Sequence, residues 1–279
     1  MGASVSSRMV RPAGEGDLPK GAADLRHALL TDPDGVFAAC GEGTVAAGIA
    51  AGVVRGDVLT VVHFEVAREA RGRGIGSALW AAVRSYGVSR GARTVEFVRP
   101  ADEATLGFLL RAGLPVRGVA LRLRAESHRA LAGPEVPLTP MQPGPALTGW
   151  VADLDRETRG FPRSVDWSVW SRSGSELFAA RRRGRPVAIG ALTLSPEHAS
   201  LGPVAAATPE AASELVLALA AKALRHGTAR IEVTLPSEAR LPLAEALRAG
   251  FRLAGSFPLL AGRSRGDLRR YAASPTAFF

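Results

Sequence analysis

A glycine-rich turn between a strand-like run and a helix-like run is the part of the chain best suited to chemistry. It reads Arg71-Gly72-Arg73-Gly74-Ile75-Gly76-Ser77. Glycines lack Cβ atoms, so the backbone can approach a ligand closely and direct successive N–H groups toward it. Those N–H groups and the dipole of the following helix attract anions, and the two arginines add forked donors. The turn therefore predicts a site for a phosphate or pyrophosphate group.

The spacing of this turn excludes two common phosphate-binding motifs. A P-loop needs Gly-Lys-Ser/Thr, which the chain lacks, and the dinucleotide fingerprint needs a third glycine where Ser77 or Leu79 stands. The spacing Arg-x-x-Gly-x-Gly, formed by Arg71, Gly74 and Gly76, resembles instead the coenzyme A pyrophosphate loop of the Gcn5-related N-acetyltransferase (GNAT) superfamily. The segments 10–12 and 108–114 also resemble the first strand and a late helix of that family.

The resemblance implies acetyl-CoA as the cofactor. By the family's arrangement, the strand ending at Val66 pairs with the pantetheine arm, and the Val66 N–H polarises the thioester carbonyl. The implied cofactor-binding residues are Phe64, Val66, Arg71, Gly72, Arg73, Gly74, Ile75, Gly76 and Ser77. A primary amine held beside the thioester would then attack it directly in a ternary complex.

Two titratable residues just before the turn are candidates for the general base that this reaction needs. Alternation along a strand places Val62, Phe64 and Val66 on the buried face and leaves His63 and Glu65 together on the other. By the family's arrangement that face points toward the acceptor. A bulge in this strand would change the faces, and the alternative is that both residues are solvated or satisfied by local hydrogen bonds.

The general acid of the family has no counterpart here. Family members often carry a tyrosine four residues before a Gly-Phe pair, where this chain has Leu109. The two tyrosines are Tyr86, at a helical core spacing, and Tyr271 near the C-terminus. The thiolate could leave unassisted, or Tyr271 or a water could protonate it. Asp102 stands where the family often has asparagine, and its role is open.

The periodicity around the turn alternates between strand and helix. Strands are predicted over residues 36–39, 45–54, 58–66, 94–98 and 116–124, and helices over 75–90 and 103–111. The last strand is expected to close the sheet of this half. The pattern predicts an α/β (α+β) fold with a mixed, mostly antiparallel sheet flanked by helices.

The second half of the chain repeats the first at a spacing of 136 to 142 residues. Phe37-Ala38-Ala39 recurs as Phe178-Ala179-Ala180, and Arg111-Ala112-Gly113 recurs as Arg248-Ala249-Gly250. A proline-rich stretch, residues 134–145, separates the copies. These matches predict two tandem GNAT-like domains, residues 1–133 and 134–279.

The second copy lacks the features that would bind the cofactor. Its counterpart of the turn, residues 201–210, has no Arg-x-x-Gly-x-Gly spacing, and Pro203 and Pro209 remove two N–H donors. We therefore expect a degenerate copy that forms a wall of the acceptor pocket or has a structural role. Asp153, Arg163, Asp166 and Trp167 are its candidate substrate-binding residues, because carboxylates beside an aromatic ring suit an ammonium group. Alternatively, Asp153 lies on a solvated helix face, Trp167 in the core, and Arg163 and Asp166 form a local ion pair.

Composition narrows the class of protein. The net charge of +9 comes from arginines spread along the chain, with only two lysines, so nucleic-acid binding is not expected. No apolar run is long enough to cross a membrane or serve as a signal sequence, and one cysteine with no Cys/His cluster predicts neither a disulfide nor a metal site. We expect a cytoplasmic protein, monomeric rather than dimeric.

These observations together predict an acetyl-CoA-dependent N-acetyltransferase acting on a small-molecule amine, such as an amino acid, an amino sugar or an antibiotic amine. The alternatives are a transferase that uses a longer acyl-CoA and a non-catalytic CoA-binding sensor or scaffold, which the missing tyrosine would suit. A nucleic-acid-binding protein is the third alternative.

Overall fold

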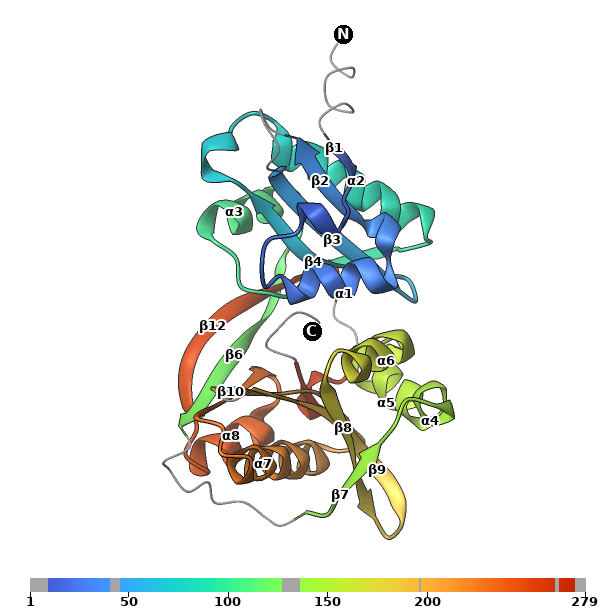
Figure 1. The fold of residues 1–279 in the computed structure, drawn as a ribbon, viewed down its shortest axis with the longest axis vertical. Helices are drawn as coiled ribbons and strands as arrows, with labels where there is room; N and C mark the ends of the chain where they lie inside the picture. The colour runs from blue at the N-terminus through green and yellow to red at the C-terminus, as the bar shows by residue number, and fades with distance from the viewer. Residues whose placement is uncertain (1–9, 41–45, 127–135, 196, 264–265, 274–279) are drawn as a thin grey trace. The chain divides into compact units, whose positions relative to one another are not determined.

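The computed structural model describes residues 10–40, 46–126, 136–195, 197–263 and 266–273. They form two compact units, which we call unit 1 (Met1–Val116 with Leu260–Arg263) and unit 2 (Arg117–Leu259 with Ser264–Phe279). Part of the proline-rich stretch between the copies, residues 134 and 135, lies outside the described residues. Each unit is a mixed α/β structure, as the periodicity predicts (Figure 1).

Unit 1 is built on a mostly antiparallel sheet in the order β1-β2-β3-β4-β5, in which only the β4–β5 pair is parallel. Its strands are β1 (Val10–Pro12), β2 (Val36–Cys40), β3 (Ala46–Arg55), β4 (Val58–Val66) and β5 (Thr94–Phe97). Its helices are α1 (Ala23–Thr31), α2 (Ile75–Ser89) and α3 (Glu103–Arg111), with short 3-10 turns η2 (Glu15–Asp17), η3 (Pro33–Gly35) and η4 (Arg68–Ala70).

Helices cover both faces of this sheet (Figure 1). Helix α2 turns Ile75, Leu79 and Val83 into the core, a spacing that follows the helical period, and packs them against Leu59 and Phe64 of β4. Helix α1 contacts β3 and β4 from the opposite face. The sheet is thus buried on both sides, which explains why β3 and β4 are almost continuously apolar.

Unit 2 repeats this plan, in the strand order β12-β6-β11-β10-β9-β8-β7, with β13 on β10. Its strands are β6 (Val116–Glu126), β7 (Leu138–Met141), β8 (Ser175–Arg182), β9 (Arg185–Leu194), β10 (His198–Ala206), β11 (Arg230–Pro236), β12 (Arg252–Ala261) and β13 (Tyr271–Ala272). Its helices are α4 (Pro145–Thr148), α5 (Trp150–Arg159), α6 (Ser164–Arg172), α7 (Pro209–Arg225), α8 (Arg240–Arg248) and the 3-10 turn η5 (Leu268–Arg270).

The closing strand differs from the sequence-based expectation. Strand β6, at residues 116–126, does form, but it pairs with β11 of unit 2, and its Leu123 and Ala125 lie in the core of that unit. In unit 1 the strand beside β5 is instead the end of β12, where Leu260 pairs with Phe97 and lies in the core cluster of that unit. The two copies therefore exchange their last strands. The exchange pairs residues far apart in sequence, and local periodicity carries no information about such partners.

Strands β4 and β5 stop pairing after Val61, in the last part of β4 before the glycine-rich turn. Their parallel register runs from Val58↔Thr94 to Val61↔Phe97, and β4 continues for five residues beyond it. At the same point β4 has a bulge, because Val61 pairs with Gly52 while His63 pairs with Ala51. The extra residue changes which side chains of β4 point into the core. Leu59 and Val61 before the bulge and Phe64 after it therefore lie in the same core.

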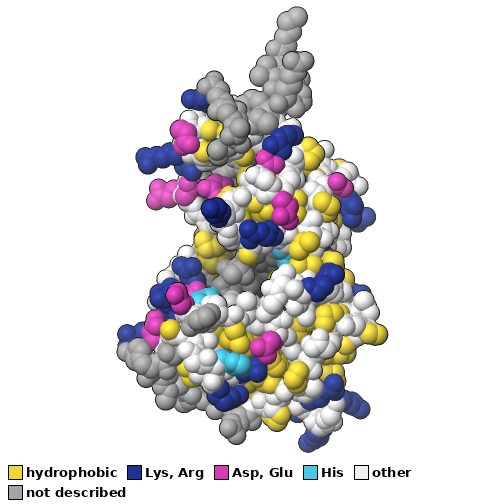
Figure 2. Space-filling view, in the orientation of Figure 1, with side chains coloured by type: hydrophobic (Ala, Val, Ile, Leu, Met, Phe, Trp, Pro, Cys, Tyr) yellow, Lys and Arg dark blue, Asp and Glu magenta, His cyan; other side chains and the backbone are white. Residues whose placement is uncertain are grey.

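The surface carries both signs of charge. On the face in Figure 2, Arg and Lys side chains are interspersed with Asp and Glu side chains. No helix in the described part of the chain is long and apolar enough to cross a membrane.

Candidate active site in unit 1

A cavity of about 380 Å³ opens where β4 meets the N-terminus of α2. Eight of the nine predicted cofactor-binding residues line it, namely Phe64, Val66, Arg71, Gly72, Gly74, Ile75, Gly76 and Ser77. The ninth, Arg73, is exposed and does not line it. Residues Ala70, Ala104, Thr105, Phe108 and Arg111 complete the wall. The glycine-rich motif does not indicate these five residues, although the spacing of Ala104, Phe108 and Arg111 along α3 predicts a common face.

The backbone of the turn has the conformation that its glycines permit. Gly72 has φ +76° and Gly74 has φ +81°, in the left-handed region that other residues avoid, and Gly74 is the N-cap of α2. The first turn of α2 has no acidic residue. The first N–H groups of a helix have no partner within it. The turn and helix end therefore offer N–H groups beside a cavity, which fits a pyrophosphate.

Arg71 connects the turn to the end of β4 and to the start of α3. Its Nε donates to the Val66 carbonyl oxygen at 3.1 Å, and its Nη2 lies 2.6 Å from Asp102 Oδ2. Asp102 is also the N-cap of α3, where its Oδ1 accepts from the Thr105 N–H at 2.8 Å. These hydrogen bonds lower the pKa of Asp102, so its carboxylate stays ionised at neutral pH. The role of Asp102, which the sequence leaves open, is thus to join α3 to the turn.

Two aromatic residues that line the cavity, Phe64 and Phe108, pack together with a third, Trp80. Phe64 stacks on Phe108 with ring centroids 5.3 Å apart, and Trp80 meets both rings edge-on at 6.1 and 6.3 Å. Such packing fixes the cavity wall before any ligand enters.

The two candidate bases lie in different environments. The His63 side chain is buried, whereas the Glu65 side chain is 69% exposed, and His63 Nε2 lies 3.5 Å from Glu65 Oε2. Burial and the positive charge of Arg99 lower the pKa of His63 to about 4, so the ring is neutral at pH 7.

Neither tyrosine lies at the cavity. Tyr86 donates to Asp32 at 2.6 Å, and burial together with that carboxylate raises its pKa. Tyr271 is fully buried in unit 2, and burial also raises its pKa. Leu109, at the position of the family's tyrosine, is fully buried. The described residues therefore place no tyrosine hydroxyl where it could protonate a leaving group.

Unit 2 has a different structure at the equivalent position. The parallel register of β10 and β11 runs from His198↔Arg230 to Leu201↔Val233. Four residue pairs of β10 and β11 are thus aligned, the same number as between β4 and β5 in unit 1. At the offset of 140 residues that this alignment sets, His63 corresponds to Pro203 and Glu65 to Ala205. Only two residues separate β10 from α7, whereas eight separate β4 from α2. This unit therefore has neither the turn nor a counterpart of the candidate bases.

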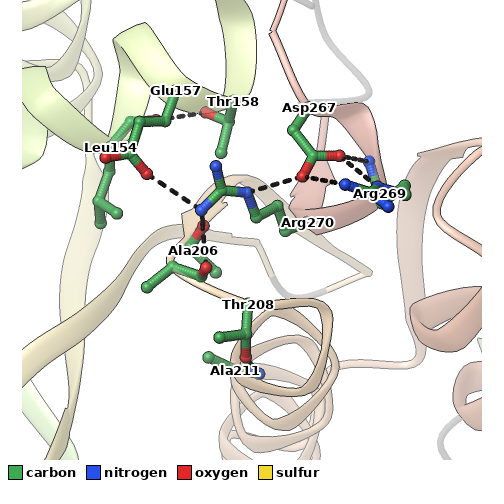
Figure 3. Close-up of polar contacts among 10 residues, drawn as sticks. Leu154, Glu157, Thr158, Ala206, Thr208, Ala211, Asp267, Arg269 and Arg270 are labelled. Atoms are coloured by element: carbon green, nitrogen blue, oxygen red, sulfur yellow. Dashed lines mark hydrogen bonds and ion pairs between the residues drawn. The ribbon is translucent and has the colours of Figure 1, made fainter.

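The C-terminal part of the chain fills the gap between β10 and β11. Strand β13 pairs antiparallel with β10 through Tyr271 and Ala272, and the Ala273 N–H donates to Thr234 of β11 at 2.8 Å. The preceding residue, Arg270, donates to the Ala207 carbonyl oxygen at 2.6 Å at the end of β10 (Figure 3 shows its other partners). In unit 1 two residues of β4 beyond Val61, Phe64 and Val66, line the cavity.

Arg270 is itself held by carboxylates from two elements (Figure 3). Its guanidinium lies 3.0 Å from Glu157 of α5 and 3.1 Å from Asp267 before η5. At the start of α7, Thr208 accepts from the Ala211 N–H at 3.2 Å and so caps the helix with a side chain of the protein.

The candidate substrate-binding residues of unit 2 are distributed between the core and the surface. Arg163, Asp166 and Trp167 are buried, while Asp153 is exposed and pairs with Arg156. The Nε and Nη2 groups of Arg163 both donate to Asp155 Oδ1, and Asp155 Oδ2 accepts from the Trp167 ring N–H at 2.9 Å. Arg163 also donates to the Tyr271 hydroxyl at 2.8 Å and so anchors β13. These contacts support a structural role for Arg163 and Trp167, with Asp155 as the carboxylate that pairs with Arg163 where the sequence suggested Asp166.

Comparison with protein-family models finds two matches. Residues 5–114 match the acetyltransferase (GNAT) family, and residues 151–253 match an acetyltransferase (GNAT) domain model. Comparison with curated protein sequences finds no significant match.

Solved structures of similar fold span most of the chain. One, from Pyrococcus horikoshii and named as a candidate acetyltransferase, has a TM-score of 0.71 at 18% identity, over 88% of this chain and 80% of its own. A GCN5-related N-acetyltransferase from Sphaerobacter thermophilus has a TM-score of 0.61 at 17% identity, over 92% and 96%. A tandem GNAT protein from the clavulanic acid biosynthesis pathway has a TM-score of 0.59 at 18% identity, over 86% and 88%.

The repeat in sequence, the two units and the two family matches agree. GNAT enzymes transfer an acyl group, and they use acetyl-CoA as cosubstrate. This chain belongs to the GNAT acetyltransferase family and is a tandem acyltransferase of that family.

Proposed function

We propose that unit 1 carries the acetyl-CoA site and transfers the acetyl group to a primary amine of a small molecule. The observation that supports this most directly is the cavity at the end of β4, with glycine N–H groups at one end and the exposed Glu65 on the adjoining strand. Acetyl-CoA supplies the acetyl group as a thioester.

Binding rests on four features of the chain. The N–H groups of residues 74–77 and Arg71 hold the pyrophosphate, and the edge of β4 beyond Val61 offers backbone groups to the pantetheine amides. The Phe64–Phe108 wall packs against the apolar part of the ligand. Arg111 of α3 supplies a further cation at the rim of the same cavity.

Proton transfer rests on Glu65. An amine arrives protonated at neutral pH, so it must lose a proton before or during attack. Glu65 is exposed on the strand that leads into the turn, where its carboxylate can take that proton directly or through water. The Val66 N–H, one residue later, polarises the carbonyl that the amine attacks. The alternative is a longer acyl chain in place of acetyl, and the room that the apolar wall leaves decides between the two.

Calorimetric titration with acetyl-CoA tests the site. We expect one site per chain, and we expect Arg71→Ala/Arg73→Ala to weaken binding at least tenfold, about 1.4 kcal/mol. The matched control is Arg240→Ala/Arg269→Ala, which removes two arginines from a cavity beside α7 and α8 in unit 2 and should leave binding unchanged. Two sites per chain would contradict the assignment to unit 1 alone.

Turnover is then measured as thiol release with a panel of amino acids, amino sugars and antibiotic amines. Repeating the assay with longer acyl-CoAs separates the two acyl-chain alternatives. Binding without turnover on any amine would contradict the small-molecule acceptor.

A further inference from the structure

A partly buried cluster beside the C-terminal end of β4 connects the candidate base Glu65 to helix α1. Its centre is Arg99, which follows β5. Arg99 Nη1 lies 2.6 Å from the Val62 carbonyl oxygen, 2.7 Å from Asp24 Oδ2 and 3.1 Å from His63 Nδ1. One cationic group thus joins α1 to β4 at the bulge, where β4 leaves β5.

The contact with Arg99 determines which nitrogen of His63 carries the proton. A guanidinium has no acceptor, and the two hydrogens of Arg99 Nη1 serve the nearer Val62 and Asp24 oxygens, so a hydrogen on His63 Nδ1 would face a cation with nothing to accept it. In a neutral imidazole the other nitrogen then carries the hydrogen. Arg99 therefore selects the tautomer with the proton on Nε2.

That Nε2–H group faces Glu65 without a hydrogen bond of its own. Within the described residues Nε2 is buried and has no hydrogen-bond partner, and the side chain is about 10% exposed. Glu65 Oε2 lies 3.5 Å away, on a side chain that is exposed at the surface. A buried donor without a partner is unfavourable, so a small rotation of Glu65 that shortens this contact is favoured.

We propose that Arg99 and His63 are positioning residues that hold the Glu65 carboxylate beside β4, and that His63 acts as a hydrogen-bond donor and not as the base. The inference rests on the proposed function, in which Glu65 accepts the proton of the amine. The titratable groups around His63 are Asp24 and His27 from α1, Glu65 from β4 and Arg99 after β5. The neighbouring residue on β3, Ala51, is apolar.

Nitrogen-15 NMR of the histidine rings tests the tautomer without any substrate. The chain has five histidines, and the spectrum of His63→Gln identifies the His63 signals. We expect a neutral His63 ring with the proton on Nε2 at pH 7. In Arg99→Gln we expect the pKa of His63 to rise, because a positive charge is removed, while Arg99→Lys keeps the wild-type tautomer. Arg93→Gln, which alters an exposed arginine on the chain just before β5, is the matched control and should change nothing.

Steady-state kinetics test the role. Glu65→Gln should lower kcat by a hundredfold or more and remove the acid limb of the kcat/KM profile. His63→Gln retains a donor toward Glu65 and should keep that limb with a loss of less than tenfold, whereas His63→Ala should lose more. Arg99→Gln should lower kcat about tenfold, and Arg99→Lys should recover part of it. The Kd for acetyl-CoA should stay within twofold in all of these variants.

The inference is wrong if wild-type His63 carries its proton on Nδ1, or if His63→Gln and His63→Ala both abolish the acid limb. The second result would make His63 the base. Failure of the proposed function is a separate result, because wild-type protein would then not bind acetyl-CoA, while the NMR spectrum would still report the tautomer that Arg99 selects.

Discussion

At the scale of single residues, His63 and Glu65 are two positions apart on one strand and lie in opposite environments. His63 is buried beside Arg99, which also pairs with Asp24 of α1, whereas Glu65 is exposed. Burial keeps the histidine neutral, and exposure leaves the carboxylate accessible to an incoming amine. The alternation of the sequence predicts a shared face, and the packing of Arg99 against His63 accounts for the difference between the two residues.

The burial of His63 makes the stability of unit 1 depend on pH. Its pKa is about 4 in the folded protein and 6.5 in the unfolded chain, so the folded state binds fewer protons between these values. Stability from the neutral ring is therefore complete above pH 6.5 and is lost as the pH falls toward 4, by roughly 2–3 kcal/mol from this group. We expect urea unfolding to show this loss in wild-type protein.

The control for this prediction is His63→Gln, which cannot titrate. Its unfolding midpoint should fall less than that of the wild type between pH 7 and pH 4.5. Equal losses in the two proteins would show that other groups determine the acid sensitivity.

At the scale of elements, each copy places a strand end against a helix N-terminus, and the connection between them decides what can bind. In unit 1 the eight residues between β4 and α2 include two glycines with positive φ and open onto a cavity. In unit 2 two residues make the connection, and β13 occupies the space between the parting strands. In the degenerate copy β13 thus bonds to β10 and β11, whereas in unit 1 the Val62 and Val66 carbonyl oxygens of β4 accept from Arg99 and Arg71.

Strand β13 depends on Tyr271, whose ring is fully buried and whose hydroxyl accepts from Arg163. We expect Tyr271→Phe to lower the free energy of unfolding by about 1–2 kcal/mol, because it removes one hydrogen bond to a buried cation. Tyr271→Ala should cost about 3–5 kcal/mol, because it also leaves a cavity. Thermal unfolding of the two variants measures the difference.

Calorimetry on the same variants tests whether the second copy lacks a cofactor site because the turn is missing or because β13 fills the space between its strands. With the turn absent, Tyr271→Ala should still bind one acetyl-CoA per chain. A second binding event would mean that β13 alone closes a competent site.

At the scale of the whole molecule, the exchange of β6 and the end of β12 makes each unit incomplete without residues from the other half of the chain. Strand β6 lies between β11 and β12 in unit 2, and Leu260–Arg263 belong to unit 1. The backbone hydrogen bonds of a sheet therefore cross the repeat boundary that the sequence indicates.

Cleavage of the chain between the repeats tests this exchange. A protease site placed within residues 127–135 leaves β6 on the N-terminal fragment and β12 on the C-terminal fragment. After cleavage we expect both fragments to elute together in gel filtration without denaturant, and to separate in urea. The fragment 1–130 expressed alone should aggregate, because β6 and β5 then expose unpaired edges. Clean separation of the nicked halves in native buffer would contradict the exchange.

Much of this protein could be predicted from local sequence. The arginine and glycine spacing of residues 71–76 identifies the turn, because positive φ and free N–H groups depend on residue type and on neighbours a few positions away. The strand and helix periodicities of each copy, and the family to which the chain belongs, follow from patterns of the same range. The absence of the turn in the second copy could also be predicted locally, from the residue types of 201–210.

Other features depend on the tertiary structure, because they join residues distant in sequence. Arg99 meets Asp24 across 75 residues, and Arg71 meets Asp102 across 31. The partner of β6 lies more than 100 residues away, and β13 reaches β10 from the end of the chain. A strand exposes the same edge to any partner of matching register, so only the packing of Leu123 and Leu260 into their respective cores decides which partner each strand takes.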